Sequence, residues 1–203
     1  MLSFIPLGNR VEEMRLLFSS IDDTAARAAA GVAAQAVLDR VLSVLSRFGR
    51  LQRLLYREAI FAWLPVPLAS QPLPWGDNLR HLVIDDQCLL PTALLQHALP
   101  KLESLVFQGE HTFDQRELNF AEWPGKLPKL RIVAGIRTMD KAQKSPWPED
   151  RSLIVVLHRR NGCPFSGGSV RLVESGSDEA EKLMKSLIFQ WQSDPFGTTA
   201  IDF

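Results

Sequence analysis

Features that identify several common classes of protein are missing from this 203-residue sequence. Positive and negative side chains balance at 23 each, so no net field draws the chain toward nucleic acid or an anionic membrane. The sequence has no run of about 18 uninterrupted apolar residues, and its first residues lack the positive segment of a secretion signal. We therefore expect an intracellular protein, cytoplasmic or nuclear, that binds neither nucleic acid nor membrane.

Cysteine is scarce as well. Cys88 and Cys163 are 75 residues apart and form no CxxC motif, which is typical of two reduced thiols. The spacings between Cys88 and the histidines His81, His97 and His111 fit none of the compact zinc patterns. A glycine loop that leads into a helix and could cradle a phosphate is missing too. We predict no metal site and no cofactor.

The sequence does contain a short apolar phrase that recurs five times. In each copy a leucine is followed three positions later by a second apolar residue that opens a β-rich run. The first leucines stand at intervals of 28, 23, 28 and 23 residues, and they are Leu51, Leu79, Leu102, Leu130 and Leu153. Leucine-rich repeats have periods of about 20 to 29 residues. The spacing therefore predicts an α/β fold, a short leucine-rich-repeat-like array of parallel strands with irregular or helical connectors.

The connectors between the phrases are rich in proline, and two of them end in the same four residues, Leu-Pro-Lys-Leu, at 99–102 and 127–130. Proline cannot donate to a sheet, so these segments are expected to be turns. We divide the chain into an N-terminal helical region (1–49, with helix over 10–48), the array (50–174) and a C-terminal amphipathic helix and tail (175–203). The last helix, capped by Ser177, is expected to cover the open edge of the array.

Residues 50–160 resemble the degenerate leucine-rich repeats of F-box/leucine-rich-repeat proteins. In that family an asparagine follows each strand, and here the corresponding positions are Ala59, Gln87, Glu110, Thr138 and Asn161. Upstream, Val37–Leu45 is similar to the first helix of an F-box and Ser46–Glu58 to the segment that closes one, while the part between them is missing. The resemblance implies a substrate-receptor role in ubiquitin ligation, with a Skp1-type adaptor as partner if the F-box is functional. The alternative for 37–58 is an ordinary amphipathic helix that leads into the first strand.

Side chains alternate across a strand, so the third, fifth and seventh positions of each phrase share one face. The fifth position is always apolar, which gives a strip of Leu55, Val83, Val106, Ala134 and Leu157. We predict that this strip and its charged rim bind a protein partner, through Arg53, Leu55, Arg57, His81, Val83, Asp85, Val106, Gln108, Leu157 and Arg159. Strands buried on both faces are the alternative, in which case the strip is core.

The expected function is a non-enzymatic protein–protein interaction module, with no catalytic residue assigned. The alternative is a small α/β enzyme. Its site would lie near Asp85 and Asp86, at the end of a strand, or in the loop of Cys163, with His158 as a base.

Overall fold

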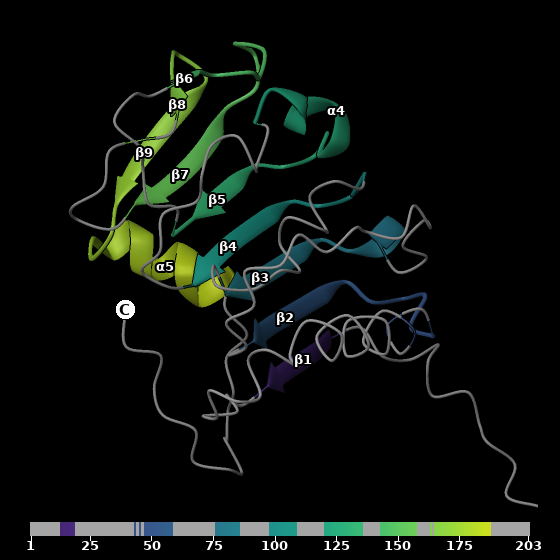
Figure 1. Cartoon of the computed structure of the whole chain (residues 1–203). Helices are drawn as coiled ribbons and strands as arrows, with labels where there is room; N and C mark the ends of the chain where they lie inside the picture. The colour runs from purple at the N-terminus through teal and green to yellow at the C-terminus, as the bar shows by residue number, and fades with distance from the viewer. Residues whose placement is uncertain are drawn as a thin grey trace, which may run out of the picture.

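The structure is a computed structural model that describes residues 13–18, 43, 45, 47–58, 76–85, 98–108, 120–135, 143–157, 163 and 165–187. Seven strands form one parallel sheet whose spatial order, β1-β2-β3-β4-β5-β7-β9, is also their order along the chain. Figure 1 shows the arrows side by side and pointing the same way. The strands are β1 (Glu13–Phe18), β2 (Arg53–Glu58), β3 (His81–Asp85), β4 (Ser104–Gln108), β5 (Ile132–Ala134), β7 (Leu153–Leu157) and β9 (Val170–Glu174). The predicted α/β class with parallel strands is confirmed.

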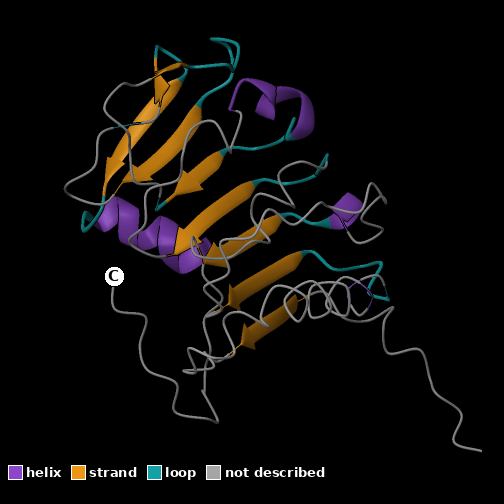
Figure 2. Cartoon of the chain, viewed as in Figure 1, coloured by secondary structure: helices purple, strands orange, loops and turns teal. Residues whose placement is uncertain are grey.

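The helices of the described residues are few and short, as the colouring in Figure 2 makes clear. Two 3-10 turns, Gly76–Asn78 and Phe120–Glu122, and the helix α4 (Trp123–Lys126) lie in the connectors. Among the described residues the longest helix is α5 (Asp178–Leu187), which begins where we expected it: the Ser177 Oγ accepts a hydrogen bond from the Ala180 N–H at 3.1 Å. Acidic residues at 178, 179 and 181 add to this cap through the helix dipole.

A recurrent backbone turn precedes each of the strands β2 to β5. The N–H of the leucine that opens the phrase donates to the carbonyl three residues earlier, at 3.0 to 3.2 Å. Two residues after that leucine the strand begins, so all four strands start in the same phase. The four turns are Phe48–Leu51, Gly76–Leu79, Leu99–Leu102 and Leu127–Leu130. Both copies of Leu-Pro-Lys-Leu are therefore the same structural element.

Neighbouring units are also joined in the same way. The carbonyl of Gln52 accepts N–H bonds from both Arg80 and His81, at 2.8 and 2.9 Å. The next two junctions repeat this forked arrangement at the carbonyls of Arg80 and Glu103. Asn78 links three of the turns, because its side chain donates to the Gly49 carbonyl at 2.6 Å and accepts from the Lys101 ammonium at 2.7 Å.

One face of the sheet packs on the main core, the larger of two buried clusters. The four leucines that close the turns are at most 1% exposed, and so are Leu54, Leu82, Leu105, Val133 and Val155, which lie beside one another in the sheet. Leu45 and Phe48, at the end of the N-terminal segment, join this core. The first and fourth positions of the first four phrases thus face the main core.

Four aromatic rings fill the end of the main core near β7. Phe120, Trp123, Trp147 and Phe165 meet edge to face, with Phe120 4.7 Å from Trp123 and 5.0 Å from Phe165, centroid to centroid. They lie in or next to the connectors, where the short strands β6 (Gln143–Lys144) and β8 (Phe165–Ser166) form a small second sheet. The repeat pattern did not predict this pair of short strands.

Two sequence predictions about the strands are wrong. The helix expected over 10–48 does not extend over residues 13–18, which form β1 and pair with β2 in parallel. Six residues are too few for periodicity to separate helix from strand. Val11, Met14 and Leu16 repeat the spacing of the leucine phrase with other apolar residues, a signal that was available.

The second error is the phase of the fifth phrase. Here the turn closes on Arg151, and Ile154, which pairs with Ile132, comes three residues later. In the first four units the equivalent residue comes two positions after the turn, so this unit has one extra residue. A slip of one residue exchanges the two faces of a strand. Val155, and not Val156, is the partner of Val133, and Leu157 packs in the main core.

Gly135 follows β5 and has the closest backbone contact among the described glycines. Its φ is +76°, and a Cβ added there would lie 2.0 Å from the carbonyl oxygen of Phe107. We predict that Gly135→Ala lowers the free energy of unfolding by about 1–3 kcal/mol, through backbone strain and the clash.

The matched control is Gly125→Ala in α4, where a Cβ would meet nothing within 4 Å. Alanine favours a helix over glycine by about 1 kcal/mol, so this change should leave stability equal or slightly higher. Urea unfolding of both variants checks the prediction, and equal stabilities would contradict it.

Candidate functional site

The candidate site lies on the face of the sheet opposite the main core, where two rows of side chains cross the strands. The register pairs Arg53, His81, Ser104, Ile132, Ile154 and Arg171, which we call the entrance row. Two residues further along each strand is the middle row, Leu55, Val83, Val106, Ala134, Val156 and Val173. For the first four phrases these are the positions that the sequence predicted for one shared face.

The middle row is buried, so the predicted exposed strip is wrong. Each of its six side chains is at most 5% exposed. They form a second core with Ala180 and Leu187, and Leu183 and Met184 pack against it. In Figure 1 α5 runs along this side of the sheet from the end of β9 toward β3 and β4. The alternative that strands are buried on both faces therefore holds for the strip.

Helix α5 lies on a face of the sheet, whereas we expected it to cover the edge. Its apolar spacing at 180, 183, 184 and 187 suits a flat apolar surface as well as an edge. The guanidinium of Arg171 is 2.7 Å from the carboxylate of Glu179, which ties the first turn of the helix to β9. Both side chains are about half exposed, so this ion pair adds little to stability.

The predicted binding residues are divided by this arrangement. Leu55, Val83 and Val106 are in the second core, and Leu157 is in the main core. Arg53 and His81 remain at the surface, exposed and partly exposed. The side chains of Arg57, Asp85 and Gln108, together with Arg159, Asp86 and His158, are outside the described part.

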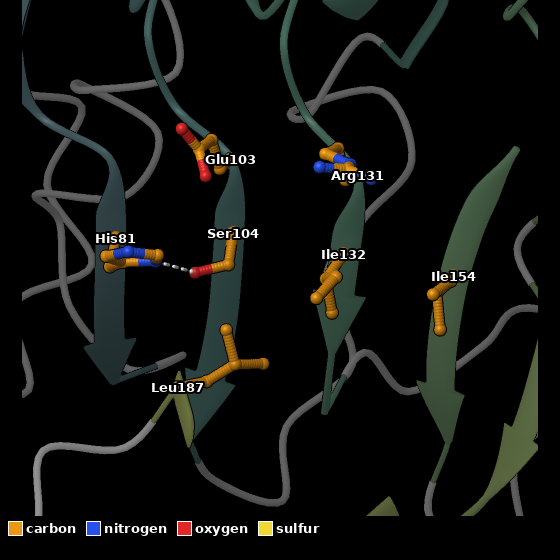
Figure 3. Close-up of a pocket in the computed structure, with 7 residues that line it drawn as sticks. All are labelled: His81, Glu103, Ser104, Arg131, Ile132, Ile154 and Leu187. Carbon is orange, nitrogen blue, oxygen red and sulfur yellow. Dashed lines mark hydrogen bonds between the residues drawn. The ribbon is translucent and has the colours of Figure 1, made fainter. Parts of the chain in front are cut away.

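A pocket opens beside the entrance row, as Figure 3 shows. Its volume is about 140 Å³. Side chains from β3, β4, β5, β7 and α5 surround it, together with the residues immediately before β4 and β5: His81, Glu103, Ser104, Arg131, Ile132, Ile154 and Leu187. One half of this wall is polar and the other is apolar.

Ser104 and His81 form the polar centre of the pocket. Ser104 is 1% exposed, and its Oγ is hydrogen-bonded to the Nδ1 of His81 at 2.8 Å. The bond joins adjacent strands and satisfies a hydroxyl that burial would otherwise leave without a partner. The aligned phrases place both residues at the same position, so the sequence contained the signal for this contact.

The charge around His81 is set by its neighbours. Burial lowers the pKa of the imidazole below its ordinary value, Arg53 and Arg80 lower it further, and Glu103 opposes them in part. Glu103 is itself 3.5 Å from Arg80 in an ion pair at the surface. These effects favour the neutral form of His81, and the positive charge nearby comes from arginine.

A serine bonded to a histidine is also part of a hydrolase site, so its surroundings matter. Stabilising an oxyanion requires N–H donors next to the nucleophile. The backbone N–H groups of Glu103, Ser104, Arg131 and Ile132 all donate to carbonyls within the sheet. These four donors are not available to a substrate, which favours binding over catalysis at this pair.

Cys163, the other suggested catalytic residue, is half-buried, and its Sγ accepts the N–H of Phe165 at 3.4 Å. Burial raises the pKa of its thiol, and the hydrogen bond opposes that only in part. A thiol of raised pKa is a poor nucleophile. Among the described residues, no three acidic, histidine or cysteine side chains gather in a way that could hold a metal ion.

Burial of the middle row makes a specific prediction about stability. A glutamate at Val106, which is 1% exposed, would place an unpaired charge in the second core. We expect Val106→Glu to lose more than about 3 kcal/mol of unfolding free energy. The control is Leu172→Glu on β9, because Leu172 is 55% exposed and should tolerate the charge. Urea unfolding measures both, and a stable Val106→Glu protein would show that the row is accessible.

His81 should make stability depend on pH. Because the pKa of His81 is lowered in the folded protein, the unfolded chain binds a proton more readily. The contribution of a neutral His81 to the free energy of unfolding is fully present above about pH 6.5. It is lost as the pH falls from there through the folded pKa. His81→Gln should reduce the stability difference between about pH 7.5 and about pH 5.5, measured by urea unfolding. An imidazole that titrates at or above its ordinary pKa in NMR would refute this.

Comparison with protein-family models, curated proteins and solved structures finds no match to this chain. None of the described helices is long and apolar enough to span a membrane. The geometry of the sheet and of its entrance row is thus the basis on which a function is assigned.

Proposed function

We propose that this chain is a non-enzymatic protein–protein interaction module, built as a short leucine-rich-repeat-like array. The observation that carries the proposal is the sheet itself, in which parallel strands follow one another in chain order with the same turn before β2 to β5. Such arrays repeat equivalent positions side by side and thereby present an extended surface to a macromolecule. Each strand of this sheet from β2 to β9 adds one residue to the entrance row.

The recognition surface in this proposal is the entrance row with the charged residues just before it. The middle row is buried under α5. The proposed partner contacts therefore lie in the entrance row, two residues before the apolar strip on each strand. Arg53 and Arg131 are exposed, and the side chains of Arg80 and Glu103 are 50% and 36% exposed. Arginine is enriched in protein interfaces, where its fork of donors binds carboxylates.

Two observations favour this function over the α/β enzyme. Open α/β sheets bind their substrates where the strand order reverses, and it does not reverse among these seven strands. The pocket at the entrance row, at about 140 Å³, is smaller than the several hundred Å³ usual for small-molecule sites. The raised pKa of Cys163 adds to them.

A substrate-receptor role in ubiquitin ligation is the more specific form of the proposal, through the resemblance to F-box/leucine-rich-repeat proteins. Leu45 is fully buried and Phe48 packs beside it in the main core. This supports the alternative in which the segment before β2 covers the first strands. Binding to a Skp1-type adaptor is a separate question, which co-purification of the adaptor with the whole chain would test.

The proposal is tested by proximity labelling in cells with the whole chain and an Arg53→Glu, Arg131→Glu double variant. Reversing two exposed charges on the recognition surface should reduce labelling of specific partners about tenfold or more, since loss of a single charged contact costs about 1.4 kcal/mol or more. The fold of the variant is checked first by circular dichroism and thermal unfolding.

The matched control is Lys129→Glu, Lys182→Glu, which makes the same change of charge at two exposed lysines outside the entrance row. It should keep the partners of the wild type. The same partners with all three proteins would contradict the proposed surface. If the protein turned over a substrate and Cys163→Ser abolished that turnover, the result would instead favour the α/β enzyme.

A further inference from the structure

The pocket at the entrance row is divided into an apolar and a polar half. Ile132, Ile154 and Leu187 form the apolar half, and Figure 3 shows the two isoleucines next to each other on adjacent strands. The polar half contains the His81–Ser104 pair, with Glu103 and Arg131 one residue upstream on their strands. A volume of about 140 Å³ is enough for one side chain, so a ligand group here needs an apolar stem and a polar end.

The charges decide which polar end fits. Arg131 and Glu103 are the two charged residues that line the pocket. Glu103 is partly neutralised by Arg80, with 3.5 Å between the guanidinium and the carboxylate. Because Arg80 offsets Glu103, Arg131 supplies the charge that a ligand group meets in the pocket, and it would repel a cation. A single negative charge complements it.

We propose that this pocket receives a glutamate side chain of a protein partner. Its methylenes would pack on Ile132 and Ile154, and its carboxylate would reach Arg131 and the His81–Ser104 pair. This inference rests on the proposed function and adds the chemistry of the partner residue. A dianion such as a phosphate group would fit less well, because Glu103 lies on the same wall and repels additional negative charge.

The experiment uses N-acetyl-glutamate N-methylamide as a probe of this one side chain. It is titrated into the whole chain while NMR follows the His81 ring and the methyl groups of Ile132 and Ile154. We expect saturable shifts at all three residues with millimolar affinity. Arg131→Gln should weaken binding about tenfold or more, because a charge-assisted hydrogen bond is lost.

Two controls isolate the charge. Lys144→Gln removes one positive charge from an exposed side chain on β6 and should leave the affinity unchanged. The glutamine analogue of the probe should bind much more weakly than the glutamate form. Absence of saturable shifts, equal binding of both probes, or no effect of Arg131→Gln would each overturn the proposal.

The two proposals can fail separately. If the entrance-row variant loses its partners while the glutamate probe does not bind, the recognition surface stands and the glutamate assignment is wrong. If the probe binds but wild type and variant label the same proteins, the proposed function fails. The pocket would then take a free carboxylate, and its assignment to a partner side chain is overturned.

Discussion

The backbone hydrogen bond that closes each turn on a leucine sets the phase of the strand that follows. In the first four units the amide of Leu51, Leu79, Leu102 or Leu130 reaches the carbonyl three residues earlier, and the strand begins two residues later. This fixed distance decides which side chains face the main core and which form the entrance and middle rows. The contact between His81 and Ser104 exists because both residues have the same position after their turns.

The leucine phrase predicted the parallel sheet and the register of β2 to β5 because those units have identical spacing. It failed at β7, where five consecutive apolar residues, Leu153 to Leu157, give no alternation and hide the extra residue after Arg151. It missed β1 because Val11 and Met14 stand where the first units of the array have leucine, close to an alanine-rich segment that favours helix.

The candidate site was predictable only in part. Strand alternation placed His81 and Ser104 on one face, so their contact followed from the register. The exposure of that face did not follow, because β-branched residues such as Val83 and Val106 suit either a solvent-facing strip or a buried sheet. The docking of α5 on the middle row decided between them. Long-range packing of this kind leaves no trace in local spacing, and neither does the position of Leu187 next to Ile132 and Ile154.

The location of α5 in the chain has a consequence for how the protein is made. The second core needs residues from β2, at Leu55, and from the end of α5, at Leu187. A ribosome delivers the chain from its N-terminus, so all seven strands emerge before the helix that buries their second face. Until residues 178–187 leave the exit tunnel, the middle row is an exposed apolar surface on the nascent chain. Transiently exposed apolar surface of this kind is prone to aggregation during folding, and the docking of α5 removes it.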